Sequence, residues 1–386
     1  MKGRHRLGLL FSITGPYATI GQAMLNGAML AIDEVNAGSE FPFAFEPSIA
    51  DPGGALSAYA RLAKSMLIEE RLAHVIGCYT SSSRKEVLPY FEKYDGLLWY
   101  PSHYEGFESS ENVVYTGASP NQHIVPLADF LLQRYGAKAY FVGSNYIWAW
   151  ENNKIMREAV LAAQGSVLAE RYVPVGDTDL EAIVGQILDL RPHFIFNTLI
   201  GDSAYAFFRT LRRAARRAGL DQPRDMPVAS CSLSEPELAE IGPEACDGHI
   251  SSSVYFESIA TEANASFARA YRRRFPGQRA TSADAEASYN AVHLLARALK
   301  AACGTDMPAV RSVLSHVEFD APQGPVRIDS DNRHSYLTPR IGVSNAQGGF
   351  DIIFAADQPI KPDPYLIWDD VRHERTPRTA HLRIVK

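Results

Sequence analysis

The chain has 386 residues, of which 46% are hydrophobic and 21% charged, a composition typical of globular proteins with more than one domain. The net charge of −6 offers no electrostatic basis for binding nucleic acid or an anionic membrane. The only basic concentration is the tail from Arg372 to Lys386, which we expect to be a solvated end. No apolar run reaches the roughly 18 residues of a transmembrane helix.

Short apolar runs alternate with amphipathic runs through the first hundred residues. This alternation is typical of βαβ units around a parallel sheet. The expected strands are 6–12, 43–49, 74–77 and 96–100. The expected helices between them are 21–36, 58–70 and 83–94, with apolar residues near helical spacing. The first part of the chain is therefore predicted to form one doubly wound lobe.

The same alternation resumes after the turn at 117–122 and predicts a second lobe. Its expected helices are 123–135, 152–164, 180–190 and 203–218, and its expected strands are 139–143, 166–173, 194–199 and 226–232. From His249 the pattern changes to a strand at 250–254, helices at 261–275 and 283–303, and a β-rich end at 317–354.

We therefore predict an α/β fold with two doubly wound parallel-sheet lobes around a ligand cleft. The chain is expected to cross between lobes near 118, 252 and 330. The first lobe would comprise 1–118 plus 253–330. The second would comprise 119–252 plus 331–386, which includes a C-terminal extension.

Polar and aromatic side chains follow four of the predicted strands, in the segments 78–83, 100–104, 144–150 and 198–203. Ligands of open parallel sheets bind at the carboxyl ends of strands. If the first two segments belong to one lobe and the last two to the other, they face each other across the cleft. Tyr146, Trp148 and Trp150 stand in a segment that we expect to be irregular, and they favour an aromatic wall for a ligand.

The composition of these segments favours a neutral ligand. An amino acid needs an anionic partner for its ammonium group, and the acidic candidates near the strand ends are Glu105, Asp202 and Glu235. A small amide needs hydroxyl groups inside an aromatic box. The residues that supply such a box are Tyr79, Ser81, Tyr100, Ser102, Tyr146 and Trp148.

Signatures of enzymes and metal sites are mostly missing. The sequence has no GxSxG elbow, P-loop, GxGxxG after a strand or HExxH. Ser82 and Lys85 fit the SxxK pattern of serine acyl-enzymes, so an amidase remains an alternative, but the companion SDN and KTG motifs are absent. The four scattered cysteines predict neither a zinc site nor a disulfide framework. We expect a protein that is not an enzyme and has no cofactor.

Nine segments spread along the chain carry a resemblance to a known family. They are GLLFSITG (8–15), DPGG (51–54), GCYTSSSRKEVLP (77–89), YPSHYEGFE (100–108), NVVYTGASPNQ (112–122), VGSNYIWAWENN (142–153), YFES (255–258), FDAPQGPVRID (319–329) and IKPDPY (360–365). Together they resemble the amide-sensing negative regulators of aliphatic amidase operons, in the type I periplasmic-binding-protein superfamily. The urea and short-chain amide binding proteins of ABC transporters are similar to these regulators.

The resemblance implies a two-lobed clamp that closes on a small amide or urea and regulates an RNA-binding antitermination protein. Carried over by position, the ligand-binding residues would be Tyr79, Ser81, Tyr100, Ser102 and His103 from the first lobe and Tyr146, Trp148, Thr198, Ile200 and Gly201 from the second. The family tends to have Tyr in place of Trp148, and Pro or Gln in place of His103. These two departures bear on which amide is bound.

The alternative within the same superfamily is a substrate-binding protein of an ABC transporter, for urea, short amides or branched-chain amino acids. It would need an export signal, and the apolar run Leu7–Phe11 is shorter than the roughly 7 to 15 residues of a signal peptide. We therefore expect a cytoplasmic protein, or a periplasmic one if an export signal precedes this sequence. No contact with nucleic acid or membrane is expected, and a homo-oligomer is possible from the sequence.

Overall fold

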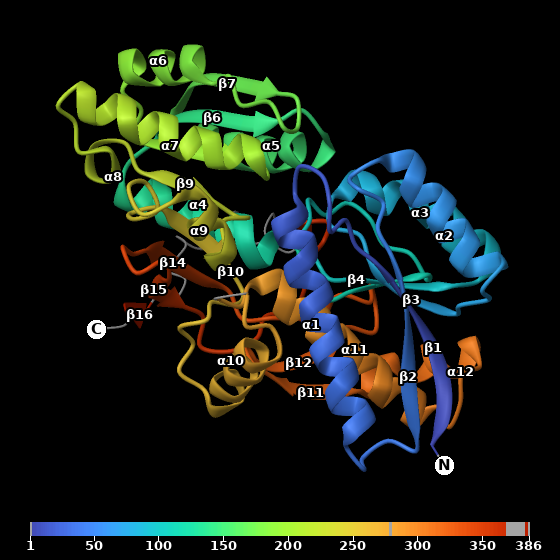
Figure 1. The fold of residues 1–386 in the computed structure, drawn as a ribbon. Helices are drawn as coiled ribbons and strands as arrows, with labels where there is room; N and C mark the ends of the chain where they lie inside the picture. Colours follow the sequence, from blue (N-terminus) through green and yellow to red (C-terminus); the bar gives the residue numbers. More distant parts are fainter. Residues whose placement is uncertain (1, 278–279, 368–382, 385–386) are drawn as a thin grey trace.

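The structure is a computed structural model that describes residues 2–277, 280–367 and 383–384. Two α/β lobes lie side by side, with the blue and orange parts of the chain in one and the green, yellow and red parts in the other (Figure 1). This arrangement confirms the predicted fold class. The basic tail lies almost wholly outside the described residues.

The first lobe is built on a five-stranded parallel sheet in the order β2-β1-β3-β4-β5. Its strands are β1 (Gly3–Leu10), β2 (Phe43–Ala50), β3 (His74–Gly77), β4 (Leu97–Tyr100) and β5 (Val113–Tyr115). Side chains alternate between the two faces, so that Leu9 packs toward one layer of helices and Leu10 toward the other.

Helices cover both faces of this sheet. They are α1 (Ala18–Ala37), α2 (Leu56–Ile68), α3 (Ser81–Tyr94), α10 (Glu262–Arg274), α11 (Ala283–Ala301) and α12 (Met307–Val313), followed by the 3₁₀ turn η1 (Leu314–His316). Helix α1 packs along α11, so the late part of the chain completes the first lobe. Gly27 permits this close approach, because a Cβ there would lie 2.0 Å from the carbonyl oxygen of Ala285.

The second lobe is built on an eight-stranded mixed sheet in the order β16-β15-β14-β10-β9-β8-β6-β7. The parallel strands are β6 (Lys138–Ser144), β7 (Ser166–Val173), β8 (Phe194–Thr198), β9 (Val228–Ser230) and β10 (Ile250–Ser253). The antiparallel strands are β14 (Arg340–Ser344), β15 (Phe350–Ala355) and β16 (Arg383–Ile384). The helices are α4 (Pro120–Arg134), α5 (Ile147–Ala162), α6 (Glu181–Leu190), α7 (Asp202–Arg217), α8 (Gln222–Asp225) and α9 (Glu235–Ile241).

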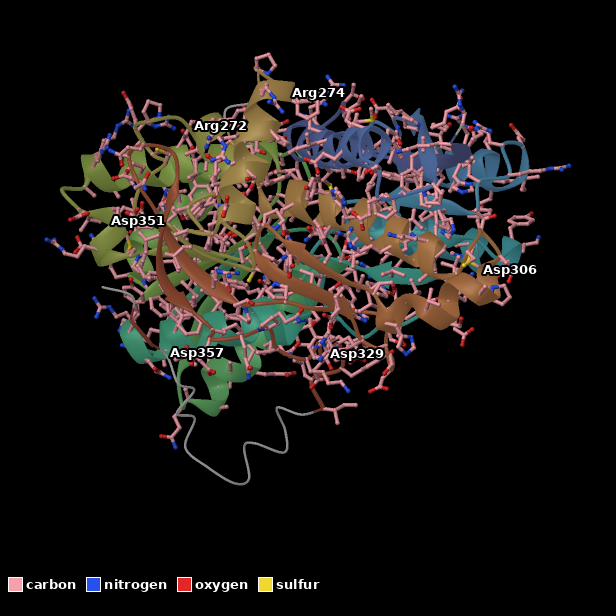
Figure 2. All side chains as sticks on the ribbon, turned by 90° about the horizontal axis from the view of Figure 1, so that it is seen from below. Arg272, Arg274, Asp306, Asp329, Asp351 and Asp357 are labelled. Carbon is pink, nitrogen blue, oxygen red and sulfur yellow. The ribbon has the colours of Figure 1, made fainter. Side chains whose placement is uncertain are left out.

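A third, antiparallel sheet lies beside α11 and consists of β11 (Glu318–Ala321), β12 (Gly324–Ile328) and β13 (Ser335–Tyr336). Charged side chains cover the surface seen in Figure 2. Some of them join elements that are distant in sequence: Arg274 of α10 lies 2.8 Å from Asp33 of α1. Lys361 lies 3.6 Å from Asp329, just after β12.

The two lobes touch each other at the mouth of the cleft. The Asp202 amide, at the start of α7, donates to the Pro16 carbonyl of the first lobe at 3.3 Å. The Thr19 hydroxyl of α1 donates to Glu240 of α9 at 3.3 Å. Gly201 has φ of +57° and ψ of −139°, and a Cβ there would lie 2.0 Å from the Pro16 carbonyl oxygen. The structure therefore shows the two lobes in direct contact at this point.

Three local expectations were wrong. The segment around Trp148 is helical rather than irregular, because α5 begins at Ile147 instead of Asn152. Strand β5 was missed, since three residues are too few to show a period. Helix α4 begins at Pro120, inside the expected turn, because Ser119 and Gln122 form a capping box there.

Candidate functional site

The strand ends bring the predicted ligand residues to one interface between the lobes. Tyr100 and Thr198 are the last residues of β4 and β8. The others follow a strand: Tyr79 and Ser81 follow β3, Ser102 and His103 follow β4, Tyr146 and Trp148 follow β6, and Ile200 and Gly201 follow β8. The rings of His103 and Trp148 meet across the interface with centroids 5.3 Å apart. Tyr146 stacks on Trp148 at 6.1 Å. As ligand contacts, all ten residues remain predictions.

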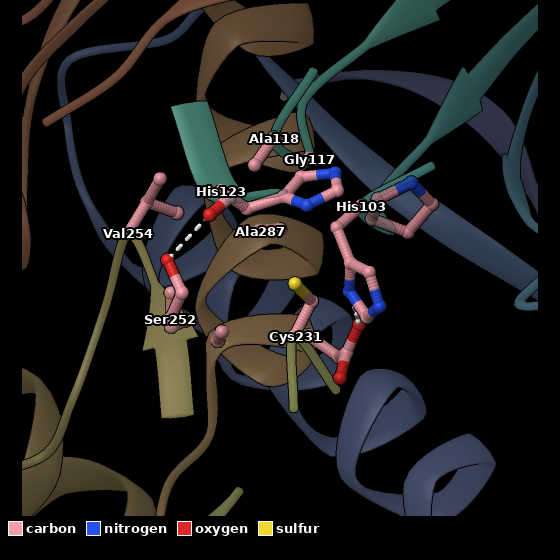
Figure 3. Close-up of a pocket in the computed structure, with 12 residues that line it drawn as sticks. His103, Gly117, Ala118, His123, Cys231, Ser252, Val254 and Ala287 are labelled. Carbon is pink, nitrogen blue, oxygen red and sulfur yellow. Dashed lines mark hydrogen bonds and ion pairs between the residues drawn. The ribbon is translucent and has the colours of Figure 1, made fainter. Parts of the chain in front are cut away.

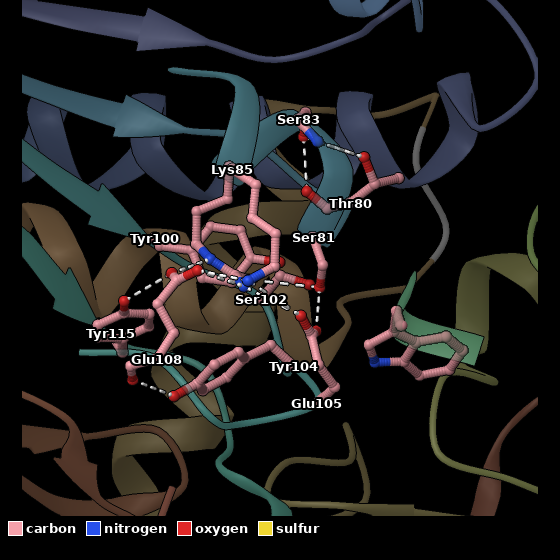
Figure 4. Close-up of polar contacts among 12 residues, drawn as sticks. Thr80, Ser81, Ser83, Lys85, Tyr100, Ser102, Tyr104, Glu105, Glu108 and Tyr115 are labelled. Carbon is pink, nitrogen blue, oxygen red and sulfur yellow. Dashed lines mark hydrogen bonds and ion pairs between the residues drawn. The ribbon is translucent and has the colours of Figure 1, made fainter. Parts of the chain in front are cut away.

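The loop after β3 is held by the loop after β4 (Figure 4). Thr80 caps α3, because its hydroxyl oxygen accepts from the Ser83 amide at 3.1 Å. The Ser81 hydroxyl donates instead to the carboxylate of Glu105. The Tyr100 hydroxyl donates to the Tyr79 carbonyl at 2.7 Å. The hydroxyl protons of Ser81 and Tyr100 are therefore already bonded within the protein.

Arg84 is the centre of this arrangement and is completely buried. Its guanidinium lies 3.2 Å from Glu105 and 2.6 Å from Glu108. It also stacks over Tyr100 and Tyr104, at 4.7 and 4.6 Å from the ring centroids. Although burial opposes the change, Arg84 and Lys85 lower the pKa of Glu108 to about 2. The buried cation thus has two carboxylate partners and fixes both first-lobe loops.

The predicted residues of the second lobe are fixed in a similar way. The Thr198 hydroxyl lies 3.1 Å from the Asn153 side-chain oxygen and 3.3 Å from the Val142 carbonyl. The Ile200 amide donates to the Ser144 hydroxyl oxygen at 3.2 Å. These contacts hold Thr198 and Ile200 within the second lobe, whereas Gly201 contacts Pro16 of the first lobe.

One polar atom at the lobe interface is buried without a partner. The indole N–H of Trp148, whose side chain is 2% exposed, has no hydrogen-bond acceptor among the described residues. The buried hydroxyl of Tyr205, on α7, interacts with the carboxyl group of Glu237. A buried polar group without a partner costs about 1–3 kcal/mol. Such atoms are expected where a ligand supplies the missing partner.

Two buried carboxyl groups also face the cleft, and the sequence did not single them out. Glu237 on α9 and Asp284 on α11 both act electrostatically on Tyr79. Burial raises the pKa of Glu237 to about 8 and that of Asp284 to about 7. Both stand in the first turn of a helix, behind the capping residues Ser234 and Ser282, and this helix-start pattern was the signal available in the sequence.

His103 and Asp284 both line a small cavity (Figure 3). Its Nδ1 is 4.0 Å from the Asp284 carboxylate, and burial lowers the pKa of His103 to about 3, so the imidazole is neutral. The cavity has a volume of about 20 Å³ and is also lined by His123, whose Nδ1 is buried without a partner. The Ser252 hydroxyl donates to the His123 carbonyl at 2.7 Å. The cavity has room for about one water molecule.

Buried ionisable groups give the protein a testable pH dependence. Burial raises the pKa of Glu235 and Glu237 to about 8, and that of Asp284 and Glu286 to about 7. Burial lowers the pKa of a set of histidines to about 4 or below: His74, His103, His123, His249 and His334. Up to about pH 7.5 these histidines add a slope of the opposite sign, because the unfolded chain binds protons that the folded chain excludes.

The folded chain holds carboxyl protons that the unfolded chain has released, so this stabilisation is complete below about pH 4 and is lost as the pH rises through 7 to 8. Glu237 should therefore lower the free energy of unfolding by on the order of 1 kcal/mol per pH unit between about pH 5 and 8. Urea unfolding of the wild type and of Glu237→Gln at each pH tests it, because the contribution of the histidines cancels in the difference between the two proteins. A difference that does not change with pH would contradict a protonated Glu237.

The arrangement around Ser82 does not favour the amidase alternative. The ammonium group of Lys85 lies 2.7 Å from Glu108 and 3.9 Å from Glu105, so it pairs with carboxylates instead of serving Ser82 as a base.

No group of three or more potential metal ligands occurs among the described residues. No helix within the described residues is both long enough and apolar enough to cross a membrane.

Comparisons with known proteins bear on the family and the fold. A family model described as a periplasmic binding protein domain matches residues 5–370. Leu/Ile/Val-binding protein homolog 6 of Brucella abortus (strain 2308) is 22% identical over 280 residues, which are 71% of this chain and 70% of that protein. A match to limonene hydroxylase of Geobacillus stearothermophilus is 29% identical over 126 residues, but spans only 33% of this chain and 23% of that protein.

Solved structures show the same fold at low sequence identity. The solute-binding protein of an ABC transporter from R. palustris, in complex with 4-hydroxybenzoate, has a TM-score of 0.83 at 19% identity, over 95% of this chain and 100% of that one. The substrate-binding protein of the branched-chain amino acid transporter of Streptococcus pneumoniae, in complex with isoleucine, has a TM-score of 0.78 at 19% identity. The match covers 93% of this chain and 100% of that one. With a family model that covers nearly the whole length and a two-lobed α/β fold, the chain belongs to the type I periplasmic-binding-protein family.

Proposed function

We propose that this protein is a receptor that closes its two lobes on a small neutral amide, such as a short aliphatic amide or urea. The observation that supports this proposal best is the indole N–H of Trp148, a buried donor without a partner at the lobe interface. A carbonyl oxygen of the ligand would accept from it.

The charges at the cleft support a neutral ligand. Glu237 and Asp284 can accept hydrogen bonds from the N–H groups of an amide, whether or not one of them keeps its proton. Whichever of the two is ionised would repel a carboxylate. Arg84, the cation in contact with Ser81, is already paired with Glu105 and Glu108. A benzoate-like anion that approached Ser81 would therefore find its neighbouring cation, Arg84, already paired.

The size of such a ligand sets its affinity. Four or five heavy atoms, at no more than about 1.5 kcal/mol each, reach about 6–7 kcal/mol of binding free energy. This corresponds to a Kd of roughly 10–40 μM. Affinity in this range requires a dry site in which nearly every polar atom is paired. Closure against Pro16 supplies the exclusion of water.

A branched-chain amino acid is the second candidate ligand. Glu237 and Asp284 could pair with its ammonium group, and the amides at the start of α3 could receive its carboxylate. The isoleucine complex of a structural neighbour lends support to this class. Isoleucine is larger than acetamide and carries two charges, so a titration with both compounds separates the candidates.

For the biological role, the relatives favour a substrate-binding component of an ABC transporter over the amidase-operon sensor that the sequence resemblance implied. The antitermination partner, the cytoplasmic location and a homo-oligomer remain predictions. Neighbouring genes for a permease and an ATPase would support transport, and genes for an amidase and an antiterminator would support sensing. We further propose that the protein is not an enzyme, so it should release no ammonia from acetamide.

Trp148→Phe tests the proposed amide contact. It removes the indole donor and keeps an aromatic ring, so the Kd for acetamide should rise roughly tenfold while the free energy of unfolding stays equal or increases. The matched control is Trp150→Phe, two residues along α5, because Trp150 is 44% exposed and donates to Asn145 at 3.1 Å. Isothermal titration calorimetry measures both. Wild-type affinity in Trp148→Phe would remove this contact from the proposal.

A further inference from the structure

Arg340 lies where the chain passes between the two lobes. The chain leaves the sheet of the second lobe after Ser253, the last residue of β10, and returns to it at Arg340, the first residue of β14. These two residues pair with each other in the antiparallel ladder between β10 and β14 (Figure 1). The outgoing segment, 254–261, and the returning segment, 337–339, therefore meet the second lobe side by side.

The guanidinium of Arg340 binds three separate stretches of backbone. Its Nη1 donates to the Val254 carbonyl, at the start of the outgoing segment. The same atom donates at 3.1 Å to the Thr338 carbonyl of the returning segment. Its Nη2 donates at 2.8 Å to the Gln323 carbonyl, in the turn after β11, which packs on α11 of the first lobe. One side chain of the second lobe thus joins both segments to the first lobe.

Gln323 continues this connection into the first lobe. Its backbone N–H and its side-chain Nε2 donate to Glu286 of α11, at 3.3 and 2.9 Å. Glu286 is completely buried and acts electrostatically on Arg340. The next residue, Ala287, accepts at 3.1 Å from the Thr116 hydroxyl, which lies between β5 and α4 where the chain first passes to the second lobe. All three connections between the lobes are therefore fastened to two adjacent residues of α11.

The chemistry of arginine suits this junction. The Arg340 side chain is 9% exposed, and burial lowers its pKa to about 10, so it is still charged at neutral pH. All three of its acceptors are carbonyl groups, which do not neutralise a buried charge as a carboxylate does. A guanidinium offers five N–H donors in a fixed fork and can bind carbonyls from several segments at once. The cost of burying the charge is explained if the relative position of these segments matters.

The contacts between the lobes at the mouth of the cleft are weaker than this junction. The Asp202 amide and the Pro16 carbonyl are 3.3 Å apart, and so are the oxygens of Thr19 and Glu240, which are exposed. A hydrogen bond between neutral groups contributes about 0.5–1.5 kcal/mol, whereas a bond to a charged group contributes about 1.5–3 kcal/mol. Exposure reduces the second of the two mouth contacts further. Separation of the lobes should therefore begin at the mouth.

We propose that Arg340 is the pivot of lobe movement, because it holds the outgoing and returning segments on the first lobe while the lobes separate at the mouth. It is a positioning residue and need not touch the ligand. The inference rests on the proposed closure of the two lobes, but it does not depend on which ligand is bound.

Two backbone amides report on the junction. The Glu257 amide, in the outgoing segment, donates at 2.7 Å to Glu235 of α9 in the second lobe. The Ile360 amide donates at 2.9 Å to the Leu337 carbonyl of the returning segment. Amides inside the two sheets report on the stability of the whole fold instead. Suitable ones are those of Leu98 and Ile195, which donate to backbone carbonyls at 2.8 and 2.9 Å.

Hydrogen exchange of the ligand-free full chain tests the pivot. Arg340→Lys keeps the charge and the fold, but one ammonium group does not reproduce a fork that binds three segments. Exchange at Glu257 and Ile360 should become roughly tenfold or more faster, beyond any change at Leu98 and Ile195. If Glu257 and Ile360 accelerate no more than these interior amides, Arg340 only stabilises the fold, and the proposal is overturned.

Arg212→Lys is the matched control. Arg212 is a buried arginine of α7, 5% exposed, which donates to Gln222 at 3.0 Å and to Asp247 at 2.6 Å, within the second lobe. Its variant should lower the melting temperature without accelerating Glu257 or Ile360 beyond the interior amides. Equal acceleration of these two reporters in both variants would also overturn the pivot. Because the exchange experiment contains no ligand, a failure to bind acetamide would overturn the proposed function and leave this result unaffected.

Discussion

Arg84→Met is expected to lower the free energy of unfolding by about 3–5 kcal/mol. The guanidinium is completely buried and pairs with Glu105 and Glu108, and methionine keeps much of its volume without its charge. The variant would leave Glu105, which is nearly buried, with only the more distant ammonium group of Lys85 at 3.9 Å. Because Glu105 also accepts from the Ser81 hydroxyl, the loss would spread to the loop that begins α3.

Lys85→Met is the matched control for this effect. Lys85 is the next residue and pairs with the same two carboxylates, but its side chain is 41% exposed. Its loss should cost no more than about 1 kcal/mol. Urea unfolding followed by circular dichroism measures both variants. A cost within about 1 kcal/mol for Arg84→Met would contradict the central role of Arg84 in this network.

Gly201→Ala should weaken binding of acetamide by roughly 100-fold, because the closed state would become inaccessible. The backbone at Gly201 has a positive φ, and an added Cβ would lie 2.0 Å from the Pro16 carbonyl oxygen of the other lobe. Pro16 would have to move away, and the two lobes would separate at the mouth of the cleft. Small-angle scattering should then show no decrease in the radius of gyration when acetamide is added.

Gly219→Ala separates this effect from backbone strain. Gly219 follows α7 with φ of +71°, and a Cβ there would meet nothing within 4 Å. This variant should lose stability, by about 1 kcal/mol, but should bind acetamide as the wild type does. If Gly201→Ala and Gly219→Ala bound acetamide equally well, the contact between Gly201 and Pro16 would not be part of closure.

The fold could be predicted because its signal is local. Buried runs such as 139–143 and 194–199 differ clearly from the amphipathic runs between them, so each β-α unit is visible in its own residues. The positions of the ligand loops follow from one general rule, that parallel strands present their carboxyl ends at the same edge. The rule brought Tyr79, Tyr100 and Trp148 to one interface without any long-range information.

The partners of those side chains could not be predicted, because they depend on contacts between distant segments. The SxxK pattern drew attention to Ser82 and Lys85, whereas the structure makes Arg84, the residue between them, the buried centre of the network. Arg84 is buried only because Glu105 and Glu108 approach from another loop, about twenty residues later. In the same way, the hydroxyl of Ser81 is used by Glu105, which the sequence offered only as a candidate for an ammonium group.

The buried carboxyls were missed for a related reason. In sequence, Glu237 and Asp284 look like ordinary acidic residues in the first turn of a helix, where they complement the helix dipole. Only the packing of α9 and α11 against the cleft removes them from water and raises their pKa values. The sequence pattern therefore predicted where α11 begins, but it missed α9 and could not show what either first turn faces.

Calorimetric titration of the unmodified chain with acetamide, urea, isoleucine and benzoate tests the central claim most directly. The unpaired indole N–H of Trp148 and the carboxyl groups of Glu237 and Asp284 predict that acetamide or urea binds, with a Kd of roughly 10–40 μM. Benzoate should give no binding at the cleft, and isoleucine should bind more weakly than the amide. Tight binding of isoleucine or benzoate, with no heat from either acetamide or urea, would contradict the account.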